Sequence, residues 1–265
     1  MTFKNNKPFF SIVICTYNRD YTINNALTSL FLQDFDDWDL IIVDDGSNDD
    51  TKINIISLIN QFNYNLGFSS LNFIEVDDLG NILENNSEIT NDNKLKVQKN
   101  NNSKNIYYYY QSNQGVTSSR NIGIKFSLKF SDSDYITFLD SDDTYLINHL
   151  SSRFEILCGL GANNLKPIDL LHGGVKVIGN EFVPDKNDVS KLIKIEYCVV
   201  GGTFFMKKNI FEQVGFFEEV DYSDDSHFFE KISMNNLKIH KTEIPTYIYN
   251  RESIDSLCDN IKIRF

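Results

Sequence analysis

Residues 135–143 read Tyr-Ile-Thr-Phe-Leu-Asp-Ser-Asp-Asp, an apolar run that ends in carboxylates. The apolar part is typical of a buried strand, where charged side chains do not belong. Because side chains alternate along an extended backbone, we expect Asp140 and Asp142 to face the same way at the carboxyl end of this strand. Open α/β sheets bind their ligands at that end.

Two carboxylates held this close repel each other unless a cation or a polar ligand lies between them. Hard divalent ions bind carboxylate oxygens and keep phosphate oxygens as further ligands. The pair therefore predicts a site for a metal ion and a diphosphate.

The segments before residue 135 predict the rest of the sheet. Phe9–Cys15 and Leu40–Val43 are continuous apolar runs, typical of buried parallel strands. Each is followed by apolar residues at helical spacing. These are Ile23, Ala26, Leu27, Leu30 and Phe31 after the first run, and Ile53, Ile56, Ile59 and Phe62 after the second. A strand–helix–strand–helix order predicts an α/β protein with a parallel sheet flanked by helices.

The pattern is lost between about residues 63 and 105, which we interpret as an insertion. Leu71–Val76 and Ile82-Leu83 flank Asp-Asp-Leu-Gly-Asn and predict a small hairpin. The Asn-rich stretch Asn85–Lys104 buries too little apolar area to offset its ordering entropy. We therefore expect it to be mobile, and its deletion to leave thermal stability nearly unchanged.

The sheet pattern resumes at Ile106–Gln111, and a helix with Ile122, Phe126 and Phe130 leads back to residue 135. The first half is thus expected to hold four strands. The second half is less regular. Its predicted elements are a helix with Leu146, Leu150, Phe154 and Leu157, strands near Ile168–His172, Val175–Ile178 and Thr203–Met206, a helix that starts at Asp224-Asp225, and a last stretch, Ile239–Ile248.

The composition limits the class of protein. With 265 residues, 41% of them hydrophobic, the chain can bury the core of a single domain. A net charge of −12 argues against a nucleic-acid surface, which depends on neutralising phosphates. No apolar run approaches the roughly 20 residues of a spanning helix, and no signal-peptide core is present, so we expect a cytoplasmic location. The four cysteines lack metal-site spacing and are expected to be reduced and structural.

Four polar clusters lie at predicted strand ends or helix starts: Thr16–Arg19, Asp44–Ser47, Gln114–Asn121 and Asp140–Asp143. Each has a structural alternative. The cluster Asp44–Ser47 is also typical of a turn followed by a helix N-cap. Arg120 could instead be a solvated charge on a helix, and Tyr17 could be a ring in the core. In a parallel sheet, however, strand ends of one kind lie on one rim, and this convergence favours a common cleft.

Asp224-Asp225 is a second acidic pair at a change from apolar to polar sequence. Acidic residues at a helix start also act as N-caps that interact well with the helix dipole. Across a cleft from a metal site, one of these carboxylates is a suitable general base for an acceptor hydroxyl. The four histidines have no ligand spacing and are expected to serve packing or surface roles.

Together these residues resemble the family 2 inverting glycosyltransferases, which have the GT-A fold. The resemblance spans about Phe9 to Arg251 and is carried by Phe10–Arg19, Leu40–Ser47, Asn113–Gly123, Phe138–Asp143 and Ser223–Asp225. It implies one domain over 1–265. Residues 1–143, with the insertion at about 63–105, would bind a nucleotide-diphospho-sugar, and 144–265 the acceptor.

The resemblance favours a UDP-sugar as donor and assigns roles within the site. It places Tyr17 and Asp45 near the base, Arg120 near the base or diphosphate, and Asp140 near the ribose. Asp142 would ligate Mn²⁺ or Mg²⁺, and Asp225 would be the catalytic base. The remaining implied site residues are Thr16, Arg19, Asp44 and Ser141 for the donor and Asp224 beside the base.

The chain departs from the family pattern at two places. The family usually has Glu-Asp where this chain has Asp224-Asp225, so either carboxylate could be the base. Tyr249–Ser253 resembles only loosely the late polar segment that the family places over the diphosphate. The implied acceptor is a glycan, a lipid-linked sugar or another hydroxyl compound in surface polysaccharide or glycan assembly. Peripheral membrane contact is compatible with this, although no basic amphipathic helix indicates it.

Two other functions fit parts of the sequence. Phe138–Thr144 matches the strand and DxDxT signature of haloacid-dehalogenase-like phosphatases, with Asp140 as nucleophile. That signature normally closes the first strand of its domain, whereas three predicted strands come before it here. The other alternative is a carbohydrate- or nucleotide-binding module without catalysis, against which both acidic pairs argue.

Overall fold

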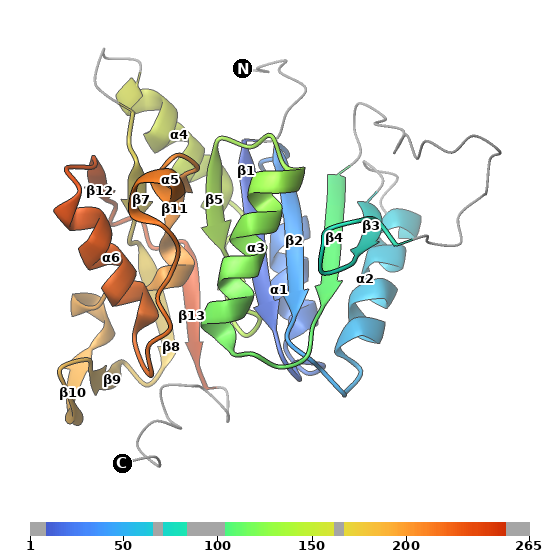
Figure 1. Ribbon diagram of the computed structural model, residues 1–265, viewed down its shortest axis with the longest axis horizontal. Coiled ribbons are helices and arrows are strands. Elements are labelled where there is room, and N and C mark those ends of the chain that lie inside the picture. Colours follow the sequence, from blue (N-terminus) through green and yellow to red (C-terminus); the bar gives the residue numbers. More distant parts are fainter. Residues whose placement is uncertain (1–8, 66–70, 84–103, 162–166, 253–265) are drawn as a thin grey trace.

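The structure is a computed structural model that describes residues 9–65, 71–83, 104–161 and 167–252. An eight-stranded sheet in the order β12-β7-β11-β5-β1-β2-β4-β3 runs through the molecule (Figure 1). Only β11 (Phe205–Lys207) is antiparallel, to both of its neighbours. The predicted mostly parallel α/β sheet is confirmed.

The first four predicted strands form the centre of this sheet. They are β1 (Phe10–Thr16), β2 (Trp38–Asp44), β4 (Lys104–Tyr110) and β5 (Tyr135–Phe138). Alternate residues face opposite sides, so Ile12 and Ile14 belong to one apolar cluster and Val13 to another. Helices cover both clusters, which is why these strands carry apolar side chains on both faces.

The helices divide between the two faces of the sheet (Figure 1). α1 (Ile23–Phe31), α2 (Thr51–Asn65) and α4 (His149–Gly161) contribute to the first cluster. α3 (Val116–Phe130), α5 (Ile210–Val214) and α6 (Asp224–Met234) contribute to the second. The starts of α3 and α6 both lie at the rim where the parallel strands end.

The apolar face predicted for α2 is only partly confirmed. Ile59 is buried and Phe62 packs against the core as expected, but Ile53 is 63% exposed. Ile55 and Leu58 are buried instead. At the start of the helix, the buried hydroxyl of Thr51 accepts a hydrogen bond from the backbone N–H of Arg19 (2.8 Å).

Part of the predicted insertion belongs to the sheet. Leu71–Val76 forms β3, an edge strand that pairs in parallel with β4. The hairpin turn is present, because Val76 and Ile82 form an antiparallel bridge. Its first strand is nevertheless a fifth parallel strand, with Ile74 and Val76 buried against one face. Of the Asn-rich stretch, only Lys104 lies within the described residues, as the first residue of β4.

The second half adds short strands around α4, α5 and α6. β7 (Leu170–His172) and β12 (Ile239–Lys241) extend the large sheet. A three-stranded sheet contains β6 (Thr144–Tyr145), β13 (Tyr247–Arg251) and β8 (Val175–Gly179). The predicted stretch Ile239–Ile248 thus divides between two sheets. Leu146 precedes α4 rather than belonging to it, and is exposed.

A two-stranded hairpin of β9 (Phe182–Asp185) and β10 (Asp188–Lys194) was not predicted. It lies below α6 in Figure 1, at the rim that carries the strand ends. Two 3₁₀ turns, Ile195–Tyr197 and Gly201–Thr203, connect it to β11. Within the part of the chain that the structure describes, no helix has the length and apolar character needed to cross a membrane.

Candidate active site

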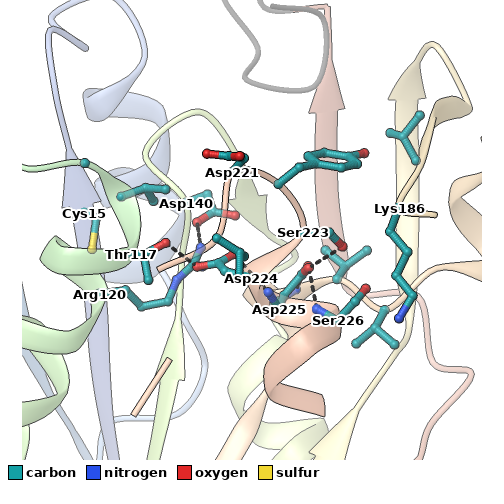
Figure 2. Close-up of a pocket in the computed structure, with 18 of the residues that line it drawn as sticks. Cys15, Thr117, Arg120, Asp140, Lys186, Asp221, Ser223, Asp224, Asp225 and Ser226 are labelled. Atoms are coloured by element: carbon teal, nitrogen blue, oxygen red, sulfur yellow. Dashed lines mark hydrogen bonds and ion pairs between the residues drawn. The ribbon is translucent and has the colours of Figure 1, made fainter. Parts of the chain in front are cut away.

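A cleft of about 1220 Å³ opens at the carboxyl ends of β1, β2 and β5. One wall comes from these strand ends and the start of α3, and the other from the β9–β10 hairpin and the segment that leads into α6 (Figure 2). Ten predicted site residues line it: Thr16, Tyr17, Arg19, Asp45, Arg120, Asp140, Ser141, Asp142, Asp224 and Asp225. The expected convergence of the polar clusters is therefore present.

Asp44 does not line the cleft. Its carboxylate is buried and accepts hydrogen bonds from the backbone N–H of Ser47 (2.8 Å) and from the hydroxyl of Tyr108 (2.6 Å). Burial, and then this contact with Asp44, raise the pKa of Tyr108 far above its ordinary value. In this structure Asp44 thus has the turn-forming role that the sequence offered as an alternative.

Asp45 holds together two loops of the wall that the strand ends and α3 form. Its carboxylate accepts hydrogen bonds from the backbone N–H groups of Gln114 and Gly115 (both 2.8 Å) and from Nε2 of Gln111 (2.7 Å). The loops approach so closely that a Cβ on Gly46 would lie 2.9 Å from the backbone nitrogen of Asn113. Asp45 therefore fixes the start of α3 against the end of β2.

Arg120 connects the two acidic pairs across the cleft. Its guanidinium is buried, 2.6 Å from Asp224 and 3.7 Å from Asp140 (Figure 2). The rings of Phe138 and Phe217 flank it, each 5.3 Å from the guanidinium carbon. Burial disfavours the charge, but Asp224 and Asp140 outweigh burial and raise the pKa of Arg120. The alternative of a solvated helix charge does not hold.

Asp224 and Asp225 have different surroundings at the start of α6. Asp224 accepts from Arg120 and from the hydroxyl of Thr117 (3.0 Å). Asp225 accepts from the backbone N–H groups of Ser226 (2.7 Å) and Gly201 (3.0 Å). Burial, followed by the charge of Asp224, raises the pKa of Asp225 to about 6. Of the pair, Asp225 has the properties of a proton acceptor near neutral pH.

Asp140 and Asp142 lie on the opposite wall, after β5. The Asp140 side chain is 36% exposed, and both residues line the cleft. Among the described residues, no group of three or more His, Cys, Asp or Glu side chains could hold a metal ion by itself. A pair of carboxylates fits a hard ion that also takes oxygens from a bound diphosphate. The residues present therefore suit Mn²⁺ or Mg²⁺ shared with a substrate.

The end of β1 supplies a buried hydroxyl and an exposed ring to the cleft. Oγ1 of Thr16 is buried and has no hydrogen-bond partner in the part of the chain described. Tyr17 is 45% exposed and could stack on a planar ligand. The guanidinium of Arg19 lies over the ring of Tyr21, 5.9 Å from its centroid.

The sequence did not predict several residues of the far wall. Lys186, at the tip of the β9–β10 hairpin, forms an ion pair with Glu230 of α6. The hydroxyl of Tyr222 donates to the backbone oxygen of Pro184 (2.9 Å). The turn-forming residues 185–188, between apolar pairs at 182–183 and 192–193, were a usable hairpin signal. Nothing in the local sequence indicates the contact of Gly201 with Asp225.

Comparison with known proteins agrees with this geometry. A family model described as "Glycosyl transferase family 2" matches residues 11–68 and 82–215. The minor teichoic acid biosynthesis protein GgaA of Bacillus subtilis (strain 168) is 25% identical over 260 residues, which are 94% of this chain and 49% of that protein. UDP-Glc:alpha-D-GlcNAc-diphosphoundecaprenol beta-1,3-glucosyltransferase WfgD of Escherichia coli is 23% identical over 197 residues, 72% of this chain and 56% of that protein. This chain thus spans about half the length of these relatives.

Solved structures confirm the predicted GT-A type fold. Residues 1–349 of S. aureus TarS in complex with UDP-GlcNAc superpose with a TM-score of 0.61 at 18% identity, over 94% of this chain and 60% of that one. The mannosyltransferase PcManGT from Pyrobaculum calidifontis, in complex with GDP-Man and Mn²⁺, superposes with a TM-score of 0.60 at 13% identity. The match covers 94% of this chain and 58% of that one. At these identities the likeness is one of fold.

Proposed function

Because the chain belongs to glycosyl transferase family 2, we propose that it transfers a sugar from a nucleotide-diphospho-sugar to a hydroxyl group of a glycan or lipid-linked acceptor. A UDP-sugar is the first candidate donor. The reaction is a single displacement that inverts the anomeric carbon.

The observation that carries this proposal is the opposition of two acidic pairs with different environments. Asp225, whose pKa is raised to about 6, lies at the start of α6 and is proposed to take the proton of the attacking hydroxyl. Asp224 is engaged by Arg120 (2.6 Å) and by Thr117, and it keeps Arg120 in place between the walls. The base is therefore assigned to the second carboxylate of the pair.

The donor would lie along the opposite wall. Tyr17 and Thr16 are proposed to contact the nucleobase of the donor. Ser141 and Asp140 are proposed to contact its ribose and diphosphate. Asp140 and Asp142 would hold Mn²⁺ or Mg²⁺, which when bound neutralises charge that develops on the diphosphate leaving group. Arg120 adds a fixed positive charge on the same side of the cleft.

The names of the related proteins support the donor and acceptor classes. WfgD is named for a UDP-Glc donor and a diphosphoundecaprenol-linked acceptor, and the TarS structure contains UDP-GlcNAc. The PcManGT structure contains GDP-Man and Mn²⁺. These names favour a nucleotide-sugar donor, a divalent ion and a role in surface glycan assembly. With a lipid-linked acceptor, the enzyme would work in peripheral contact with the cytoplasmic face of the membrane.

A phosphatase that uses Asp140 is not favoured. β5 is neither the first strand of the chain nor at the edge of the sheet, and Asp140 lies beside Arg120 and opposite a second acidic pair. A binding module without catalysis has no need of Asp225 with a raised pKa. Both alternatives are outcomes of the experiment below.

The test is release of free nucleoside diphosphate from a panel of UDP- and GDP-sugars, with Mn²⁺ and with EDTA. We expect release from one donor, increased by a matching acceptor and abolished in Asp225→Asn. Each variant is also assayed with p-nitrophenyl phosphate. Hydrolysis of that ester with no nucleotide release would support the phosphatase, and donor binding without release would support the binding module.

A further inference from the structure

The acidic turn after β5 is anchored from behind by a buried carboxylate. The backbone N–H of Asp143 donates to the backbone oxygen of Asp140 (3.0 Å), which closes the turn. Asp143 itself is fully buried and accepts a hydrogen bond from the backbone N–H of Asn250 (2.8 Å). Its other oxygen accepts from the hydroxyl of Tyr247 (2.6 Å). Both partners belong to β13, more than a hundred residues away.

The same hydroxyl reaches Asp140. It lies 3.4 Å from Oδ2 and 3.4 Å from the backbone nitrogen of Asp140. The other carboxylate oxygen, Oδ1, lies 3.7 Å from Nη2 of Arg120. The Asp140 carboxylate is thus contacted on one side by a hydroxyl and on the other by a guanidinium, and its remaining surface faces the cleft.

Tyr247 has no freedom to move away from this position. It is completely buried, packed against the rings of Tyr145 (5.8 Å between centroids) and His149 (6.1 Å). A Cβ on Gly202 would lie 2.1 Å from the Tyr247 hydroxyl oxygen, so only glycine fits there. Gly201, the residue before it, donates to Asp225. One hydroxyl therefore lies between the donor-side turn and the segment that holds the base.

We propose that Tyr247 is a positioning residue, which with Asp143 fixes the Asp140–Asp142 turn in the geometry that binds a metal–diphosphate. A tyrosine hydroxyl can donate only one hydrogen bond, and the short distance to Asp143 indicates that Tyr247 donates it there. Its lone pairs then face the backbone N–H of Asp140. This role rests on the proposed function, because it requires that the turn binds a nucleoside diphosphate with a divalent ion.

The test compares Tyr247→Phe with Tyr145→Phe. Tyr145 is a buried neighbour whose hydroxyl donates to the backbone oxygen of Phe138 (2.6 Å) rather than to Asp143. Binding of UDP, and of GDP in parallel, is measured by calorimetry with Mn²⁺ and with EDTA, and melting temperature is recorded for each variant. In Tyr247→Phe we expect the Mn²⁺-dependent gain in affinity to fall about tenfold, the size of one buried hydrogen bond. In Tyr145→Phe the gain should equal that of the wild type, whatever the change in melting temperature.

The outcomes separate this role from the proposed function. Wild-type protein that binds neither nucleotide more tightly with Mn²⁺ would overturn the proposed metal site, and this role with it. A wild-type gain that Tyr247→Phe retains in full, or that Tyr145→Phe loses equally, would overturn the positioning role alone. If Tyr247→Phe does not fold, Asp143→Asn is tested in its place. Its amide group has one acceptor oxygen instead of two, so it cannot keep the contacts with both Tyr247 and Asn250. It should show the same loss, and an unchanged gain in that variant would refute the role.

Discussion

Asp225 differs from its neighbour in how it titrates. Burial and the charge of Asp224 raise its pKa to about 6, against the opposing influence of Arg120 and two backbone N–H groups. A base must be ionised to accept a proton, so kcat/KM should fall as the pH drops below about 6. In Asp224→Asn a charge that raises this pKa is gone, and the acidic limb should move to lower pH. pH–rate profiles of the wild type and of Asp224→Asn check this. An acidic limb at the same pH in both would show that it does not report the titration of Asp225.

Substitution of each carboxylate by its amide distinguishes their roles. Asp225→Asn keeps the size of the side chain but cannot take the proton, so turnover should fall by about 10²–10⁴-fold while donor affinity is unchanged. Asp224→Asn should be milder. Single-turnover rates and donor titrations measure both effects. Near-normal turnover in Asp225→Asn with collapse in Asp224→Asn would transfer the base to Asp224.

Arg120 also stabilises the folded chain. Removing one member of a buried ion pair leaves the other charge uncompensated, so Arg120→Met should lower the free energy of unfolding by about 3–5 kcal/mol. Lys52→Met is the control, because Lys52 and Glu75 form a pair (3.0 Å) that is far more exposed and should contribute about 0–1 kcal/mol. Urea unfolding measures both. Equal losses of unfolding free energy in the two variants would show that solvent screens the Arg120 pair to the same degree as a surface pair.

At the level of residues, the sequence predicted which side chains meet but not which of two neighbours does what. Asp44 and Asp45 are adjacent, yet one faces Tyr108 in the interior and the other holds the start of α3. The partner that decides this comes from β4, more than sixty residues away in the chain. The roles of Tyr247 and Gly201 were out of reach for the same reason, because only the fold brings them to the acidic pairs.

Substitution of two helical glycines by alanine should change stability in opposite directions. Gly123 of α3 packs on β1 so tightly that a Cβ would lie 2.3 Å from a methyl carbon of Val13, so Gly123→Ala should cost about 1–3 kcal/mol of stability. A Cβ on Gly159 of α4 meets nothing within 4 Å, and Gly159→Ala should stabilise by about 0.5–1 kcal/mol through helix propensity. Thermal unfolding of the two variants should shift in opposite directions. An unchanged or raised melting temperature in Gly123→Ala would refute the close packing of α3 on β1.

At the level of elements, most strands were predictable from apolar runs, including the short strands β7 and β8, but partners and packing faces were not. The central strands carry apolar side chains on both faces, which shows in the sequence because both faces are covered. In α2, Ile59 and Phe62 face the core as predicted, whereas Ile53 does not, and Ile55 and Leu58 are buried in addition. β3 pairs with β4, which is distant in sequence, so the local pattern did not show that it belongs to the large sheet.

At the level of the whole molecule, charge decides what the cleft can bind. Its described lining contains the nine carboxylates of Asp45, Asp140, Asp142, Asp185, Glu219, Asp221, Asp224, Asp225 and Glu230, and the cations Arg19, Arg120 and Lys186. Arg120 and Lys186 are already paired with Asp224 and Glu230. A nucleoside diphosphate brings further negative charge into this cleft, which its excess of carboxylates over cations disfavours.

Donor binding should therefore depend on a divalent ion. We expect UDP or its sugar to bind much more tightly with Mn²⁺ than with EDTA, and Asp142→Ala to erase that difference because it removes a ligand from the open side of the turn. Asp185→Asn is the matched control, since it removes a carboxylate from the hairpin wall and should leave the Mn²⁺ effect intact. Calorimetric titration of the three proteins measures the effect. Equal affinity with and without the ion in the wild type would mean that the cations of the cleft suffice, and would reject the metal site at Asp140 and Asp142.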